Sequence, residues 1–138
     1  MKTKKILVTG GSGMVGTALK KVTQDAIFIS SKDCDLRSQS DTFDLYNPHK
    51  PTHIIHLAAK VGGIAANSNY LADFYTDNIQ INTNVLAAAH HHNVEKVVSL
   101  LSTCIYPDKA IYPLTEDQIH SGRPHVSNYA YAYAKRML

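Results

Sequence analysis

The sequence lacks any apolar stretch long enough to cross a membrane, and it has no repeat or low-complexity tract. Its first residues are charged, but the apolar run that follows is too short for the apolar region of a signal peptide. Only two cysteines occur, Cys34 and Cys104, and their spacing fits neither a zinc site nor a disulfide framework. These absences predict free thiols in a reducing cytoplasm, no membrane association and no bound metal.

Charge is also scarce, since Lys, Arg, Asp and Glu make up 18% of the chain and the net charge is +3. The basic residues are scattered, which argues against a nucleic-acid partner. With 138 residues, 44% of them hydrophobic, the chain has material for one globular domain with a buried core. A mildly basic chain of this kind suits an anionic small molecule as its ligand.

Short β-rich runs alternate with longer helical stretches, which predicts an α/β fold. Strands are expected at 4–9, 26–30, 52–58 and 96–102; helices are expected at 13–24, 38–47 (ended by Pro48 and Pro51), 70–92 and from 127 onward. This alternation indicates a Rossmann-type, doubly wound parallel sheet, for which we expect the strand order 3-2-1-4. Ligands of such sheets bind beyond the carboxyl ends of the strands.

Three glycines spaced three apart, Gly10, Gly13 and Gly16, follow the first expected strand and open the first helix. A glycine at each position allows a tight turn, close approach of the backbone to a pyrophosphate, and close packing of helix on strand. The turn therefore predicts a dinucleotide site. Its expected members are Gly10, Gly11, Ser12, Gly13, Met14, Val15 and Gly16.

The second expected strand ends in two serines and Lys32 rather than in an acid. An acid there would hold the ribose 2′-hydroxyl of NAD, whereas a cation suits the 2′-phosphate of NADP. The pattern therefore favours NADP(H), although the nearby Asp33 leaves NAD open and Lys32 could simply be solvated.

Tyr131 and Lys135 are four residues apart on the last expected helix and share one face. An ammonium near a phenol is expected to draw its pKa down from about 10, so that Tyr131 gives a proton to a substrate oxygen. Ser102, at the end of the fourth expected strand, is the candidate partner for that oxygen, with Thr103 as a positional rival. Tyr129 is excluded because a tyrosine, Tyr133, stands four residues after it.

The glycine spacing and the Tyr-x-x-x-Lys pair resemble those of the short-chain dehydrogenase/reductase superfamily. Three segments narrow the resemblance to the GDP-L-fucose synthase family of its extended branch: HLAAKVGGI (56–64), STCIYP (102–107) and YAYAKRM (131–137). The resemblance implies an NADPH-dependent epimerase and reductase that makes GDP-L-fucose from GDP-4-keto-6-deoxy-D-mannose.

The resemblance also implies roles for further residues. Asp35 and Leu36 would touch adenine, Ala58 and Ala59 would line the cofactor, and Lys135 would bind the nicotinamide ribose. Lys60 falls where the family lines the nicotinamide and substrate. Asn78 falls where extended members of the superfamily hold an asparagine in the long helix, although it could equally be an exposed polar residue. Cys104 would act as the base that removes the proton beside the ketone; a buried structural cysteine is the alternative.

The chain stops on the helix of Tyr131 and Lys135, so residues 1–138 are expected to be only the amino-terminal, cofactor-binding portion of such an enzyme. The rest of the sheet, the substrate domain and the histidine that opposes Cys104 would be missing. A homodimer is expected for the longer form, through helices that include 70–92 and the last one. Two alternatives stay open: a catalytically inactive dinucleotide-binding remnant, and a different extended nucleotide-sugar epimerase or dehydratase.

Overall fold

The computed structural model describes residues 3–138. The chain divides into two compact units. Unit 1 comprises residues 3–59 and 80–100, and unit 2 comprises residues 60–79 and 101–138. Each is described here by itself.

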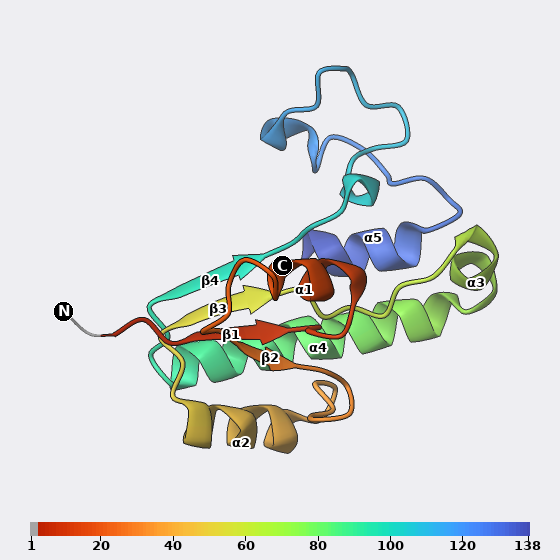
Figure 1. Ribbon diagram of the computed structural model, residues 1–138. Coiled ribbons are helices and arrows are strands. Elements are labelled where there is room, and N and C mark those ends of the chain that lie inside the picture. The colour runs from red at the N-terminus through yellow and green to blue at the C-terminus, as the bar shows by residue number, and fades with distance from the viewer. Residues whose placement is uncertain (1–2) are drawn as a thin grey trace. The chain divides into compact units, whose positions relative to one another are not determined.

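A four-stranded parallel sheet forms the centre of unit 1 (Figure 1). Its strands are β1 (Ile6–Thr9), β2 (Ile27–Ile29), β3 (His53–His56) and β4 (Lys96–Ser99). The sheet confirms the expected parallel α/β architecture. The strand order is β2-β1-β3-β4, however, so the expected order 3-2-1-4 was wrong.

The central position of β3 in the sheet agrees with the burial of its side chains. Ile54 is 1% exposed and His56 is fully buried, and β3 is hydrogen-bonded on both sides, to β1 and to β4. The edge position falls instead to the three-residue β2. After β2 the chain crosses back over β1, so the winding reverses between β1 and β3. In a doubly wound sheet that reversal is the place where ligands bind.

Helices connect the strands. The helix α1 (Met14–Leu19) leads from β1 to β2, α2 (Gln39–His49) leads from β2 to β3, and α4 (Leu71–His91) precedes β4. Right-handed crossovers in opposite directions place α1 on one face of the sheet and α2 on the other, as Figure 1 shows. The part of α4 in unit 1 packs beside α2, where Tyr46 donates a hydrogen bond to the carbonyl of Val85 at 3.1 Å.

The hydrophobic core of unit 1 lies between β3 and these two helices. Its buried members are Leu36, Tyr46, Ile54, Val85, Ala88 and Ala89. Pro48 lies inside α2, which runs on to His49, so the expectation that Pro48 ends this helix was wrong. The helix ends one residue later, where Lys50 adopts a left-handed conformation with φ 44°.

Unit 2 contains shorter elements. They are α3 (Ile64–Asn69), the first part of α4, two 3₁₀ turns, η1 (Thr103–Ile105) and η2 (Glu116–Gln118), and α5 (Tyr129–Arg136). The sequence did not predict α3, and the expected fourth strand ends at Ser99 rather than at Ser102. Within residues 3–138, no helix has the length and apolar character that crossing a membrane requires.

Candidate active site

The glycine turn of unit 1 follows β1 directly. Gly10 has φ +72°, and a Cβ placed on it would lie 2.7 Å from the backbone nitrogen of Ala58, just past β3. A Cβ on Gly16 would lie 2.5 Å from the carbonyl oxygen of Gly10. The fold itself therefore requires glycine at both positions, because the turn passes against β3 and α1 packs against the turn.

Gly13 is different, because the fold does not demand it so strictly. A Cβ on Gly13 would meet only the Gly10 carbonyl oxygen, at 3.3 Å, which a small shift would relieve. Around it Ser12, Met14 and Val15 are exposed, Met14 at 87%. Open backbone at this position fits a pyrophosphate, for which a side chain here would be an obstacle.

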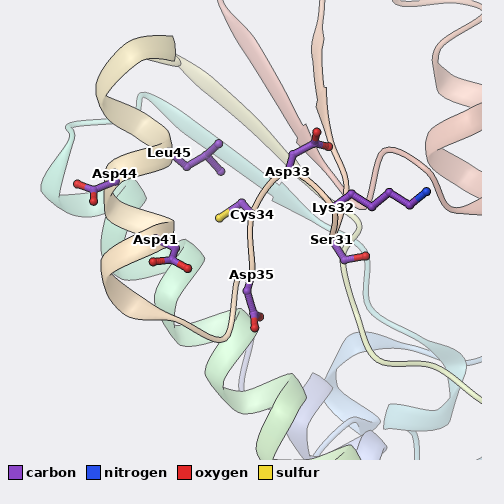
Figure 2. A pocket seen from close by; sticks show the side chains of 8 residues that line it. All are labelled: Ser31, Lys32, Asp33, Cys34, Asp35, Asp41, Asp44 and Leu45. Atoms are coloured by element: carbon purple, nitrogen blue, oxygen red, sulfur yellow. The ribbon is translucent and has the colours of Figure 1, made fainter.

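The loop after β2 carries the residues expected to read the adenosine ribose (Figure 2). Asp33 accepts hydrogen bonds from the backbone nitrogen of Ser30 at 2.8 Å and from its hydroxyl at 2.6 Å, and these bonds lower the pKa of Asp33. Lys32 is exposed and extends away from Asp41 and Asp44 in Figure 2. Asp33 is thus engaged within its own turn, whereas the Lys32 ammonium points outward.

A shallow pocket of about 420 Å³ lies along this loop and the start of α2. Its lining residues are Ser31, Lys32, Asp33, Cys34, Asp35, Asp41, Asp44 and Leu45 (Figure 2). Its four carboxylates do not form a cation site: residues 3–138 contain no group of three or more His, Cys, Asp or Glu arranged to hold a metal ion.

Asp35 and Leu36 point in different directions. Asp35 accepts three hydrogen bonds from Arg37: from Nε at 2.9 Å, from Nη2 at 2.8 Å and from the backbone nitrogen at 3.0 Å. These bonds lower the pKa of Asp35 to about 2. Leu36 is 8% exposed and belongs to the core of unit 1. Their contact with adenine stays a prediction, as does the lining role of the half-buried Ala58 and Ala59.

In unit 2, Ser102 and Cys104 lie in the turn after β4. The Ser102 hydroxyl caps η1 by accepting a hydrogen bond from the backbone nitrogen of Cys104 at 3.3 Å. Ile105 anchors the turn at 2% exposure, and Nε of Arg136 on α5 donates to the carbonyl of Ile105. Ser102 is half-buried, whereas its positional rival Thr103 is exposed.

Tyr131 and Lys135 lie one turn apart on α5. Burial raises the pKa of Tyr131, the neighbouring Cys104 adds to the rise, and a hydrogen bond with Ser102 opposes it. The expected lowering by Lys135 was therefore wrong for the chain without ligand. Lys135 is itself only 2% exposed, and burial lowers its pKa by disfavouring the ammonium form.

Asn128 is a residue of this site that sequence reasoning missed. It occupies the cap position of α5, but its side chain makes no capping bond. Its Nδ2 instead donates to the sulfur of Cys104 at 2.8 Å. The only signal in the sequence was its place three residues before Tyr131, and a capping role explained that place equally well.

Asn78 is fully buried, so the alternative of an exposed polar residue was wrong. It holds the loop after β3 at two points: Oδ1 accepts from the Lys60 nitrogen at 2.9 Å and Nδ2 donates to the Lys60 carbonyl at 3.0 Å. The Lys60 ammonium pairs with Asp77 at 2.7 Å. Asn78 thus fixes the backbone of Lys60, and Asp77 directs its side chain.

Comparison with known proteins shows what the chain is similar to. Residues 6–138 match the family model described as the NAD dependent epimerase/dehydratase family. The chain is 50% identical to GDP-L-fucose synthase of Dictyostelium discoideum over 142 residues, which is 98% of this chain and 44% of the relative. It is 51% identical to a probable GDP-L-fucose synthase of Drosophila melanogaster, again over 98% of this chain and 44% of the relative.

A solved structure agrees. The crystal structure of a GDP-L-fucose synthetase from Naegleria fowleri bound to NADP superposes with a TM-score of 0.91 at 43% identity, covering 99% of this chain and 43% of that one. The chain thus spans less than half the length of the relatives that it matches.

Proposed function

The chain belongs to the NAD dependent epimerase/dehydratase family, and from this premise we propose that it is the cofactor-binding portion of an enzyme that converts GDP-4-keto-6-deoxy-D-mannose to GDP-L-fucose. The substrate would be a GDP-sugar and the reductant NADPH. Support comes from the two GDP-L-fucose synthases at 50% and 51% identity and from the gathering of Ser102, Cys104 and Tyr131 in unit 2. That gathering carries the proposal.

The residues of unit 1 fit NADP(H). The turn from Gly10 to Gly16 would hold the pyrophosphate, and Lys32 would face the 2′-phosphate while Asp33 is occupied by Ser30. When bound, the nicotinamide supplies the hydride. The NADP carried by the Naegleria fowleri relative supports this choice over NAD.

Tyr131 would act as the acid of the reduction. Burial raises its pKa, so the phenol keeps its proton near neutral pH and has it to give. The developing charge on the substrate oxygen would be stabilised by the Ser102 hydroxyl beside it. Lys135, buried on the same face of α5, would bind the nicotinamide ribose.

Cys104 would act as the base of the epimerisation. Inverting a carbon beside a ketone needs a base on one face and an acid on the other, and a thiolate is a suitable base. The Nδ2 of Asn128 donates a hydrogen bond to this sulfur at 2.8 Å, which holds the sulfur in place. Cys34 is unsuited to this role, because burial and the surrounding aspartates raise its pKa.

Two measurements test the proposal. NADPH fluorescence on titration with the chain, repeated with NADH and with Lys32→Ala, tests the cofactor; we expect binding of NADPH in preference to NADH and a loss of that preference in the variant. Turnover of the keto sugar nucleotide then tests the activity. Binding without turnover would favour a non-catalytic dinucleotide-binding protein, and activity that survives Cys104→Ser in a longer form would favour a different nucleotide-sugar epimerase or dehydratase.

A second copy of the chain is the expected partner. Unit 2 presents an apolar groove of about 410 Å³ between the start of α4 and α5. Its lining residues are Leu71, Ala72, Tyr75, Tyr129, Ala130, Tyr133 and Met137. Exposed tyrosines and methionine are common in subunit interfaces, and analytical ultracentrifugation of the wild type and of Tyr133→Glu would detect the dimer and its loss.

The proposed setting is the cytoplasm. Both cysteines are free in the structure, and reduced thiols are the rule in that compartment.

A further inference from the structure

A chain of hydrogen bonds joins β1, β3 and α4 inside unit 1. Thr9 and His56 are fully buried and Asn82 is 3% exposed. The Thr9 hydroxyl lies 2.7 Å from Nδ1 of His56, and Nε2 of His56 lies 3.2 Å from Oδ1 of Asn82. The backbone nitrogen of Ala58 donates to the same Thr9 hydroxyl at 3.3 Å.

The groups at the two ends of this series of hydrogen bonds determine which atom donates in each bond. The amide oxygen of Asn82 can only accept, so Nε2 of His56 must carry the proton that it donates. In neutral imidazole the other nitrogen is then an acceptor, and the Thr9 hydroxyl donates to it. Because the hydroxyl oxygen still has a free lone pair, it accepts from Ala58. With a neutral imidazole, the four groups therefore form one directed hydrogen-bond chain in which the proton of His56 lies on Nε2.

This chain of hydrogen bonds lies between β1 and β3, where the winding of the sheet reverses. The regular ladder between β1 and β3 ends when Leu57 donates to the Thr9 carbonyl at 3.3 Å, because Gly10 then turns away with φ +72°. The Thr9 side chain provides the next acceptor, for Ala58. The same Ala58 nitrogen is the atom that a Cβ on Gly10 would meet at 2.7 Å. The hydroxyl thus sets the spacing between the glycine turn and the backbone after β3.

We infer that Thr9, His56 and Asn82 are positioning residues for the dinucleotide: their hydrogen-bond chain holds the backbone of Ala58 against the Gly10 turn at the spacing that the cofactor requires. This inference rests on the proposed function, in that it takes NADP(H) as the ligand. None of the three side chains needs to touch the cofactor. They act through the backbone amide of Ala58.

The first test compares two variants of Thr9 in the complete 138-residue chain. Thr9→Ser keeps the hydroxyl, whereas Thr9→Val keeps the shape and removes it, leaving the Ala58 amide and His56 Nδ1 without this partner. We expect Thr9→Val to weaken NADPH binding by about tenfold, measured by fluorescence at a temperature where the variant is folded. Thr9→Ser should bind as the wild type does.

The outcomes separate this inference from the proposed function. A wild type that binds NADPH and a folded Thr9→Val that binds it equally tightly would overturn the positioning role and leave the function standing. A wild type that does not bind NADPH would overturn both.

The second test needs no variant to fold. In ¹⁵N-labelled wild type at neutral pH, long-range correlations between ring nitrogens and ring protons identify the protonated nitrogen of each histidine. The signals of His56 are assigned in the wild type through scalar couplings from its own backbone amide. We expect a proton on Nε2 alone; a proton on Nδ1 would contradict the direction of the chain and overturn the inference.

Discussion

The side-chain amide of Asn128 donates a hydrogen bond to the sulfur of Cys104 at 2.8 Å, across 24 residues of sequence. Asn128 is the residue that precedes α5, and Cys104 lies in η1. The bond therefore ties the helix of Tyr131 to the turn of Ser102 through the group that would act as the base.

Replacing Asn128 should change how fast Cys104 reacts. In a Cys34→Ser background Cys104 is the single thiol, so its alkylation by iodoacetamide can be followed by mass spectrometry. Asn128→Asp keeps the shape but puts a carboxylate beside the sulfur, which disfavours the thiolate, and the rate near neutral pH should fall by about tenfold. An unchanged rate would show that the amide does not act on the sulfur.

Lys135 is expected to destabilise the folded chain when no ligand is bound. Burial lowers the pKa of Lys135, so the unfolded chain binds its proton more tightly than the folded chain does. Stability then rises with pH in the range below the ordinary value of 10.5, where only the unfolded chain holds the proton. Lys135→Met removes this cost, and urea unfolding should show a gain of about 1 kcal/mol near neutral pH, together with weaker NADPH binding. A large loss of stability would contradict the account.

Substitutions at two glycines of the turn should affect folding stability and NADPH binding differently. Gly13→Ala meets only the Gly10 carbonyl oxygen, at 3.3 Å, so the chain should unfold at nearly the wild-type urea concentration. Its affinity for NADPH should nevertheless fall by about tenfold or more, because the added methyl group occupies space that the pyrophosphate needs.

Gly10→Ala is the matched comparison. It should lower the free energy of unfolding by roughly 1–3 kcal/mol, since the residue has φ +72° and its Cβ would crowd Ala58. A Gly13→Ala chain that binds NADPH as the wild type does would remove the reason for placing the cofactor at this turn.

Tyr46 should make the chain sensitive to alkali. Burial raises the pKa of Tyr46 above its ordinary value of 10.0. Above that pH the unfolded chain loses this proton first and so binds fewer protons, which means that stability falls as pH rises. Tyr46→Phe should flatten this decline, although at neutral pH it should cost about 1 kcal/mol through the lost bond to Val85.

Urea unfolding at neutral pH and at about pH 11 measures both effects. The exposed Tyr112 gives the control, because Tyr112→Phe should change neither value. An alkaline decline equal in Tyr46→Phe and wild type would contradict the assignment.

Local patterns in the sequence were sufficient for the parts of the fold that local chemistry decides. The apolar run before Gly10 predicts β1, and the spacing of Tyr131 and Lys135 on a helix is the spacing that α5 shows. The strand order was not predictable in this way. It depends on whether β2 or β3 is central, and that is decided by the burial of Ile54 and His56 between two neighbours.

The same distinction between local pattern and tertiary burial applies to the candidate site. The Tyr131 hydroxyl was singled out from its spacing to Lys135, but the direction of its pKa shift depends on burial, which spacing does not report. Asn128 has the residue type and place of a helix cap, whereas in the structure its side chain donates to Cys104. The bonds of His56 were not predictable from local pattern, because they join it to Thr9 and Asn82, which lie 47 and 26 positions away.

The central claim is that the Gly10–Gly16 turn holds the pyrophosphate of NADP(H), with Lys32 at its 2′-phosphate. The most direct measurement is a crystal structure of the 138-residue chain grown with NADPH. The account predicts the pyrophosphate along the turn and the 2′-phosphate at Lys32. A dinucleotide bound elsewhere, or a 2′-phosphate directed away from Lys32, would contradict it.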